Sequence, residues 1–401
     1  MSPKFPPSWT IHLFKEIAEV ITGTTPLTSH PQYYGGSIPF IGPTELGRED
    51  PIIKSPKSLS DEGATQARLL PREAVLVCCI GATIGKIGFS GTELATNQQI
   101  NALVCNKNIA FPRYVFHYCQ TLLSLFRHQG ASTTLPLLPK GRFQEIEIPI
   151  PPLEEQKRIA EILDRTQSLI SKRKEAIELL DTLTQSIFLE TFGDPEINPH
   201  SWDVQAVSTY VSQFQGGKSI ESESDENTVA KNRVLKVSAV TQMKFRPKES
   251  KPLPDTYEPP DEHFVRNGDL LFSRANTTEL VGAVAYVEKT PSNLLLPDKL
   301  WRFVWKQPIK VLPLFVWSLF QTKVMRREIG KRATGTSGSM KNISQEKLLG
   351  IKTIVPPLKL QKEFAQQVEA VEKLKATHRA SLTELQALFA SLQHRAFRGE
   401  L

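Results

Sequence analysis

The sequence predicts an α+β protein in which two mixed, strand-rich globular regions are separated by two long helices that form an antiparallel coiled coil. Three observations predict this class. A Pro-Pro unit occurs twice, a heptad pattern follows each copy, and short β-like runs bounded by glycine fill much of the remaining sequence. The matching halves indicate an internal duplication with pseudo-twofold symmetry.

The duplication is clearest at the two Pro-Pro units. PPLEEQKRIAEIL begins at Pro151 and PPLKLQKEFAQQV begins at Pro356. The two copies align without a gap as far as Phe192 and Phe397. A repeat unit of this length indicates duplicated domains and not a solenoid of short repeats.

The starts of the two halves also correspond. PSWTIHLFKEIAEVITGTTP, from Pro7, aligns with HSWDVQAVSTYVSQFQGGKS, from His200. A chain of 401 residues is also too long for one ordinary core. We therefore expect four segments, which are globular regions at 1–149 and 194–355 and helical spacers at 150–193 and 356–401.

Each Pro-Pro unit marks the start of a helix, because proline is accepted in the first turn of a helix but not in its interior. Alternate steps of four and three residues from Ile159 and from Phe364 trace a seam of about four heptads. The apolar seam positions are Ile159, Leu163, Ile170, Ile177, Leu180 and Ile187 in the first helix and Phe364, Val368, Val371, Leu382, Leu385 and Phe389 in the second.

Two such helices bury each other's seams, each over a length on the order of 60 Å. Polar residues interrupt the seams at Thr166, Arg173, Lys375 and His378, and we expect them to set the register of the pair. The alternative is that each helix packs only on its own globular region.

The globular regions contain matching β-like runs and one helical stretch each. VLVCCIG, KIGFSG and INALV in the first region correspond to DLLFSR, GAVAYVE and LWRFVW in the second. RYVFHYCQTLLSLFRHQ (113–129) and LFVWSLFQTKVMRREIG (314–330) are amphipathic with basic C-terminal ends, so each predicts a helix.

Composition narrows the class of protein. No run approaches the roughly 18–20 apolar residues of a membrane span, and the first residues lack the apolar core of a signal peptide. The four cysteines have no metal-ligand spacing, so we expect reduced, buried thiols in a cytoplasmic protein. The net charge of +7 favours nucleic-acid binding only weakly.

Motifs of catalysis are missing from the sequence. GATIGK (81–86) has three residues between its glycines where a phosphate-binding P-loop has four, and Ile87 replaces the Ser or Thr that would hold Mg²⁺, so a tight strand connection is preferred. We find no G-x-S-x-G, no H-E-x-x-H and no Asn/Asp-Pro-Pro-aromatic tetrapeptide of an amino-methyltransferase. A duplicated chain of this kind predicts a binding and positioning scaffold that is not an enzyme and holds no metal.

The whole pattern resembles the DNA specificity subunits of prokaryotic type I restriction–modification systems, the HsdS family. The residues that carry the resemblance are PPLEEQKRIAEIL with its helix to Phe192, the copy PPLKLQKEFAQQV to Phe397, the two Ser-Trp openings, GATIGKIGF and ATNQQINAL. It extends over essentially the whole chain.

This resemblance implies that each globular region is a target recognition domain that reads one half of a split site in double-stranded DNA, and that the coiled coil fixes the gap between the halves. It implies two modification (methyltransferase) subunits as partners, which hold S-adenosylmethionine and methylate adenine, and restriction subunits that use ATP and Mg²⁺. No cofactor and no membrane contact are expected for this chain. Because the two regions differ in sequence, we expect an asymmetric target.

Candidate DNA contacts are polar and basic residues in turns, since Lys and Arg contact phosphates while Arg, Asn and Gln also read bases. They are Lys86, Asn97, Gln98, Gln99, Lys140 and Arg142 in the first region and Lys218, Arg274, Asn276, Lys299, Lys341 and Asn342 in the second. GTSGSMKN (335–342) is interpreted as a flexible loop that orders on DNA, or equally as a plain surface loop.

Other readings stay open at this point. One is an orphan specificity subunit, or a purely structural coiled-coil scaffold, without restriction partners. Another is the specificity chain of a system whose cleaving subunit also methylates. A nuclease site hidden in the second region would need a cluster of metal-binding carboxylates, which the sequence does not reveal.

Overall fold

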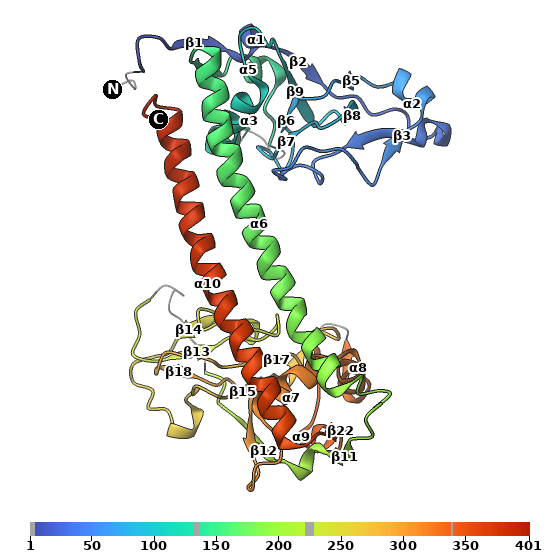
Figure 1. Cartoon of the computed structure of the whole chain (residues 1–401), viewed down its shortest axis with the longest axis vertical. Helices are drawn as coiled ribbons and strands as arrows, with labels where there is room; N and C mark the ends of the chain where they lie inside the picture. Colours follow the sequence, from blue (N-terminus) through green and yellow to red (C-terminus); the bar gives the residue numbers. More distant parts are fainter. Residues whose placement is uncertain (1–4, 131–135, 221–227, 338–339) are drawn as a thin grey trace. The chain divides into compact units, whose positions relative to one another are not determined.

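The computed structural model describes residues 5–130, 136–220, 228–337 and 340–401. The chain divides into two compact units (Figure 1). Unit 1 contains Met1–Glu175 and Arg379–Leu401, and unit 2 contains Ala176–His378. Both are built from small sheets, short helices and one half of each of two long helices.

Unit 1 contains two four-stranded sheets and a two-stranded ribbon. The central sheet has the order β2-β9-β6-β7, the outer sheet β4-β3-β8-β5, and the ribbon β1-β10. The strands are β1 (Thr10–Leu13), β2 (Ala18–Thr22), β3 (Tyr34–Ile41), β4 (Ser58–Leu59), β5 (Leu69–Leu70), β6 (Val75–Cys78), β7 (Ile87–Phe89), β8 (Leu94–Thr96), β9 (Ile100–Cys105) and β10 (Glu147–Ile150). The short helices are α1 (Phe14–Ile17), η1 (Pro31–Tyr33), α2 (Asp61–Thr65), α3 (Pro112–Thr121), α4 (Leu123–Gly130) and α5 (Lys140–Gln144).

Strand β6 shows why these residues form a central strand. Its side chains alternate between two cores, since Val75 and Val77 pack with α3 and the long helices while Leu76 and Cys78 pack against the outer sheet. A strand buried on both faces needs a continuous apolar run, and VLVC is completely buried.

Unit 2 repeats this architecture. Its central sheet has the order β12-β19-β15-β17, and smaller sheets have the orders β14-β13-β18, β16-β21-β20 and β11-β22. The strands are β11 (Asp203–Ala206), β12 (Val211–Gly216), β13 (Arg233–Leu235), β14 (Ser250–Pro252), β15 (Leu270–Ser273), β16 (Ala275–Asn276), β17 (Val284–Tyr286), β18 (Leu294–Leu295), β19 (Leu300–Trp305), β20 (Thr334–Ser337), β21 (Met340–Asn342) and β22 (Lys352–Val355). The short helices are η2 (Val207–Thr209), η3 (Val237–Ala239), η4 (Asp261–His263), α7 (Pro313–Gln321), α8 (Lys323–Arg332) and α9 (Gln345–Leu349). The predicted α+β class and internal duplication are confirmed.

The long helices are α6 (Leu153–Phe192) and α10 (Leu358–Ala396), and each lies within its predicted spacer. In unit 1, the start of α6 and the end of α10 join one core, where Ile159 and Leu163 are buried with Ala396. In unit 2 the end of α6 meets the start of α10, and the rings of Phe192 and Phe364 lie 5.3 Å apart. These pairings are those of antiparallel helices, which also pack on the globular cores.

The glutamine of each Pro-Pro unit has a structural role that is the same in both copies. Gln156 is completely buried. Its amide nitrogen donates to the carbonyl oxygens of Ile109 and Pro151, both at 2.9 Å, and its oxygen accepts from the N–H of Phe111 at 2.7 Å. One side chain thus joins the start of α6 to the loop that leads into α3.

Gln361 makes the same three contacts in unit 2. Its amide nitrogen donates to the carbonyl oxygens of Lys310 (3.2 Å) and Pro356 (2.7 Å), and its oxygen accepts from the N–H of Leu312 (2.8 Å). The glutamine that follows each Pro-Pro is therefore a structural clamp that sets where the long helix leaves its globular region.

Two expectations about the short helices are wrong. Each helical stretch predicted as continuous is two helices, broken at Leu122 in unit 1 and at Thr322 in unit 2. Thr322 has extended backbone angles, and its hydroxyl accepts from the N–H of Met325, so it ends α7 and caps α8. Both stretches also begin one residue earlier than predicted, on a proline at the first helical position.

The cysteines are free, and three of the four are buried. Burial raises the pKa of Cys79 to about 12 and that of Cys105 to about 12, so both thiols stay protonated and unreactive at neutral pH. No helix in the described part of the chain is both long enough and apolar enough to cross a membrane.

Candidate nucleic-acid interface

In both units three chain segments meet where a central strand ends, and we call this place the strand-end junction. In unit 2 the backbone N–H of Arg274, just after β15, donates to the carbonyl oxygen of Lys299 (3.1 Å), and its carbonyl oxygen accepts from the N–H of Ile343 (3.0 Å). In unit 1 Cys79 makes the same two bonds, from its N–H to Gln99 (2.8 Å) and from Leu138 to its carbonyl oxygen (2.8 Å). These bonds make Arg274 the counterpart of Cys79, and Lys299 the counterpart of Gln99.

The junction of unit 2 gathers five of the six residues predicted there. Arg274 and Lys299 belong to it, and the β16–β21 pair places Asn276 opposite Lys341 and Ala275 opposite Asn342. The sixth, Lys218, is exposed and follows Gly217, whose N–H bonds to Pro297 near the same end of the sheet.

Two residues of the sequence GTSGSMKN fall outside the described residues, at 338–339. Its ends form the paired strands β20 and β21, so the expectation of a loop throughout is wrong for those ends. Lys341 donates from Nζ to the carbonyl oxygen of Gly335 at 2.8 Å.

Unit 1 carries side-chain amides at its junction. Asn97 Nδ2 donates to Gln99 Oε1 (2.9 Å), and Asn97 Oδ1 accepts from the backbone N–H of Gln99 (3.1 Å). Gln98 Oε1 accepts from the hydroxyl of Thr25 at 2.5 Å. Asn97 is thereby held by its neighbours, while the amide nitrogens of Gln98 and Gln99 have no hydrogen-bond acceptor among the described residues.

Lys140 and Arg142 are exposed on α5, which follows Leu138 of the same junction by two residues. Lys86 is also exposed, but it does not join the amides. It lies at the far end of the Gly81–Gly85 connection and lines a separate pocket. The positive φ of Gly85, 85°, explains the glycine there, and the connection is a tight turn as the sequence predicts.

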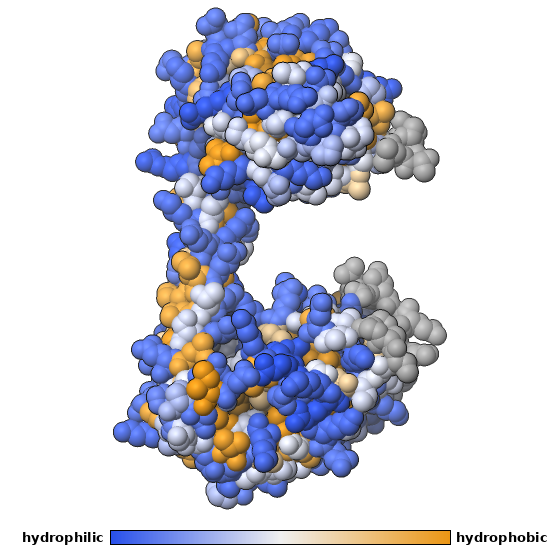
Figure 2. All heavy atoms as spheres, turned by 90° about the vertical axis from the view of Figure 1, so that its right-hand side faces the viewer, coloured by the Kyte–Doolittle hydropathy of each residue, from blue (hydrophilic) through white to orange (hydrophobic). Residues whose placement is uncertain are grey.

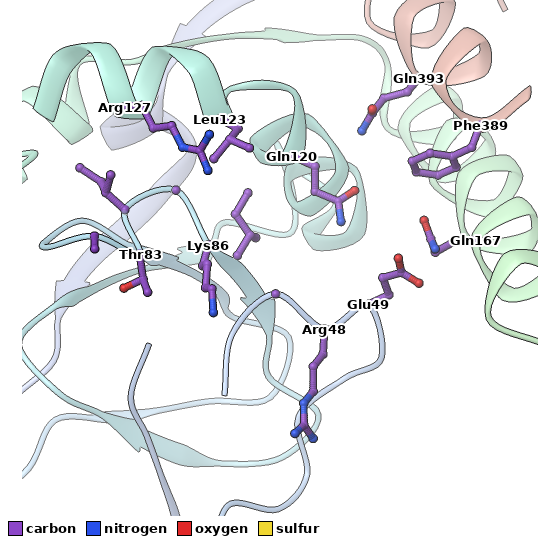
Figure 3. A pocket seen from close by; sticks show the side chains of 15 residues that line it. Arg48, Glu49, Thr83, Lys86, Gln120, Leu123, Arg127, Gln167, Phe389 and Gln393 are labelled. Atoms are coloured by element: carbon purple, nitrogen blue, oxygen red, sulfur yellow. The ribbon is translucent and has the colours of Figure 1, made fainter. Parts of the chain in front are cut away.

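That pocket has a volume of about 400 Å³ and lies within unit 1 (Figure 3). Arg48, Lys86 and Arg127 line it, and none of the three has an ion-pair or hydrogen-bond partner for its side-chain charge within the described ranges. Three glutamines also line it: Gln120 of α3, Gln167 of α6 and Gln393 of α10. The arrangement offers three cations to an anion.

Glu49 is the acidic residue of this pocket, and it is already bound to α6. Its carboxylate accepts from the hydroxyl of Ser171 at 3.0 Å and lies 4.0 Å from the ammonium of Lys174. The loop that carries Arg48 is thus tied to the long helix, and the acidic group does not neutralise the three cations.

The predicted seam positions are all buried or half-buried, at both the apolar positions and the polar interruptions. Lys375 is the most unusual of them, since its side chain is only 2 % exposed. Its ammonium lies 3.1 Å from Asp181 of α6 and 2.5 Å from Glu372, and Lys244 also donates to Asp181 at 2.5 Å. This polar interruption therefore joins both long helices to unit 2.

The pKa values of two aspartates of α6 are lowered. Burial would raise the pKa of Asp181, but hydrogen bonds from Lys244 and Lys375 outweigh it and lower the pKa. Burial likewise opposes, and hydrogen bonds from His117 and Arg113 produce, a lowered pKa for Asp164 of α6. Both carboxylates are charged at neutral pH and tie a long helix to a globular region.

Sequence reasoning missed several residues of these sites. Arg127 was visible only as part of a basic helix end, and Arg48 gave no local signal, because the pocket forms from segments that are distant in the sequence. Asp298, whose carbonyl oxygen accepts from Arg274, and Trp301, whose ring lies under the Arg274 guanidinium, were also missed. Trp301 could have been found as the first aromatic residue of the β-like run LWRFVW, two positions after Lys299.

Metal-binding clusters of three or more His, Cys, Asp or Glu residues are absent from the described ranges. Asp269 shares one property with catalytic acids, because burial raises its pKa despite opposing bonds from Arg266 and Arg302. It is instead paired with Arg302 at 3.3 Å, and both side chains are 13 % exposed, which is the arrangement of a structural ion pair.

Comparisons with known proteins point to one family. A family model described as the type I restriction modification DNA specificity domain matches residues 6–179. The MjaVIII specificity subunit of Methanocaldococcus jannaschii is 26% identical over 388 residues, which cover 92% of this chain and 88% of that protein. The EcoKI specificity subunit of Escherichia coli is 24% identical over 430 residues, which cover 99% and 90%.

Coverage is shorter for another relative, the MjaIX specificity subunit of M. jannaschii. It is 28% identical over 199 residues, so the chain spans about half of that protein, 46% of its length. Among solved structures, the type I S subunit from M. genitalium superposes with a TM-score of 0.62 at 14% identity and covers 99% of both chains. A chain from a study of complex assembly in a type I R-M system gives 0.60 at 16% identity, over 99% of this chain and 100% of that one. These two likenesses show the fold.

Proposed function

We propose that this chain, which is similar over most of its length to type I restriction–modification specificity subunits, selects a split, asymmetric site in double-stranded DNA and positions partner subunits there. The observation that carries the proposal is the strand-end junction. It occurs in each unit with the same backbone bonds but with different side chains, as expected if two copies of one recognition fold read two different sequences.

The side chains divide into two kinds of DNA contact. The amides of unit 1 and the Arg–Lys–Asn set of unit 2 carry groups that hydrogen-bond to base edges. The pocket cations Arg48, Lys86 and Arg127 suit phosphates, which position a protein on DNA without specifying sequence.

Partner subunits are proposed to dock on the long helices. Large hydrophobic side chains are exposed along α6, among them Leu179 (63 %) and Leu189 (49 %), and Leu388 (49 %) is exposed on α10. Figure 2 shows hydrophobic atoms along the helices among largely hydrophilic neighbours. A partner that covers these leucines would remove apolar surface from water, which favours association.

We further propose two modification subunits and the restriction subunits as those partners, with S-adenosylmethionine, ATP and Mg²⁺ bound by them and not by this chain. The chain itself would then be non-catalytic and would work in the cytoplasm, where its DNA lies. The long likeness to specificity subunits supports this assembly over a scaffold without restriction partners.

A binding selection tests the proposed function. The chain is purified in complex with the modification subunit encoded beside it, and bound duplexes are selected from a randomised library and sequenced. We expect enrichment of two defined half-sites at a fixed gap. Selection of no sequence by an intact complex, or of the same sequence by modification subunits alone, would overturn it.

A further inference from the structure

Arg274 is held more firmly than the other predicted contacts of unit 2. Its Nε donates to the carbonyl oxygen of Asp298 at 2.7 Å, and its Nη2 lies 3.6 Å from the Asp298 carboxylate. The guanidinium stacks over the indole of Trp301, 5.6 Å from the ring centroid. The side chain remains 32 % exposed, while Trp301 beneath it is buried.

Backbone contacts fix the same residue from both sides. The bonds to Lys299 and Ile343 described above hold its N–H and carbonyl oxygen at the strand-end junction. In the described part of the chain nothing accepts from Nη1. The guanidinium therefore presents one edge, made of Nη1 and the outer side of Nη2, in an orientation that is set before any ligand binds.

Arg302, in strand β19 of the central sheet of unit 2, provides a comparison with an arginine whose role is structural. Arg302 is 13 % exposed, and its terminal nitrogens donate to the carbonyl oxygens of Phe264 (2.9 Å) and Glu262 (2.8 Å) and to Asp269. Both terminal nitrogens thus donate within the unit. Arg274 instead uses Nε for support and leaves its terminal edge outward.

We propose that Arg274 reads a guanine, with Nη1 and Nη2 donating to the O6 and N7 atoms in the major groove. This inference rests on the proposed function and specifies it for one half-site. Guanine offers two acceptors side by side, which match the two parallel donors of an oriented guanidinium. A phosphate would need only charge, and the stacking and backbone support would then be unnecessary.

The contact is confined to the half-site of unit 2. The counterpart of Arg274 in unit 1 is Cys79, which is 2 % exposed and offers no donor fork. The junction of unit 1 instead carries Gln98 and Gln99, whose amides match adenine better than guanine. The two units thus differ in the class of base they can read at this position.

The test uses the complete complex with the wild-type chain and with Arg274→Lys and Arg274→Gln. Selection from a randomised library gives the half-sites of each. Lysine keeps the charge but loses the planar fork, so a base reader and a phosphate contact respond differently. Arg266→Lys is the matched control, since Arg266 is an exposed arginine of unit 2 paired with Asp261 away from the junction.

We expect the wild-type complex to require guanine at one position of one half-site. Both Arg274 variants should relax this position, with preference for guanine over the next base falling by about 5- to 150-fold, while the other half-site and the control remain unchanged. Replacing that guanine by 7-deazaguanine, which lacks the N7 acceptor, should weaken binding of the wild type and cause no further loss in Arg274→Gln.

Three results would overturn the inference: an unchanged motif in both variants, a uniform loss of affinity in Arg274→Gln that Arg274→Lys restores, or no penalty for 7-deazaguanine at any guanine of the wild-type site. The 7-deazaguanine measurement uses only the wild-type chain, so it can refute the guanine contact even if the Arg274 substitutions prevent assembly. A wild-type complex that selects no split motif would instead refute the proposed function itself.

Discussion

At the scale of single residues, a few buried polar side chains fix the geometry that the long helices need. Gln156 and Gln361 hold the starts of the long helices in place. Lys375 of α10 forms an ion pair with Asp181 of α6. Gln156, Gln361 and Lys375 each hydrogen-bond to named partners, as buried polar groups generally do.

The clamp predicts a large cost for a small substitution. Gln156→Ala should lower the free energy of unfolding by roughly 2–4 kcal/mol, because it leaves a backbone N–H and two carbonyl oxygens without their partner. Chemical denaturation monitored by tryptophan fluorescence measures it. The matched control is Gln386→Ala on the exposed face of α10, expected within about 0.5 kcal/mol of wild type. Equal effects of the two substitutions would contradict the clamp.

The lowered pKa of Asp181 predicts a pH dependence. A carboxyl whose pKa is lower in the folded protein adds stability above its unfolded pKa, and this stability is lost as pH falls through the folded value. Asp181→Asn should therefore lower the melting temperature at pH 7, and the difference from wild type should shrink as pH falls below 3.8, the ordinary value for Asp. Melting curves from pH 7 to 3 measure it, with exposed Glu258→Gln as control. A difference that persists unchanged at pH 3 would argue against the ion pair.

The pocket cations predict an effect on affinity without an effect on sequence. Replacing Arg48, Lys86 and Arg127 together by Gln should reduce the slope of log K against log salt by about 3, roughly one for each phosphate that the variant no longer neutralises. Binding titrations of the assembled complex at several salt concentrations measure it.

The control for that experiment replaces three exposed cations of unit 1 outside the pocket, Lys54, Lys57 and Arg72, by Gln. It removes the same charge and should change the slope less. A changed recognition motif in the pocket variant, or an equal loss in the control, would show that the pocket is not a phosphate site.

At the scale of elements, the sequence predicts the long helices and central strands well because their signals are local. Pro151 and Pro356 mark helix starts, the heptads give the buried stripe, and VLVC reads as a strand buried on both faces. The break at Thr322 was missed, because a single extended residue inside an amphipathic stretch leaves the apolar pattern intact.

The candidate contacts were predicted as residue types in turns, but not as a site. Residues 79, 99 and 138 are joined by backbone bonds across the strand-end junction, and no sequence pattern gives such bonds. Arg48 and Arg127 were missed for the same reason, because the pocket brings together segments that are distant in the sequence. Lys375 shows the opposite case, since a lysine in a heptad seam is a visible anomaly that the buried ion pair explains.

Helix length should set the gap of the recognised site. Deleting seven residues, one heptad, from both α6 and α10 preserves the seam and shortens each helix by about 10 Å, equivalent to about three base pairs. The selected gap should shorten while both half-sites keep their sequences. Deleting seven residues from one helix only, which disrupts the pairing, is the control and should reduce assembly. An unchanged gap in a stable double deletion would contradict a spacer role for the helices.

At the scale of the whole molecule, one chain carries the same architecture twice, with divergent side chains at matching places. Gln156 and Gln361 preserve the clamp, whereas Cys79 and Arg274 differ at the junction. The scaffold is thus kept in both copies while the surface proposed for base reading has diverged. This division is what a subunit needs if it presents two different recognition surfaces on one framework.

The measurement that tests the proposed role of specificity subunit most directly is the mapping of methylated adenine by long-read sequencing. The chain is expressed with its neighbouring modification subunit in a host free of DNA methylation, and the modification subunit alone serves as control. We predict a split, asymmetric methylation motif that appears only when this chain is present. A folded, assembled complex that methylates no defined motif, or the same motif without this chain, would contradict the role of specificity subunit.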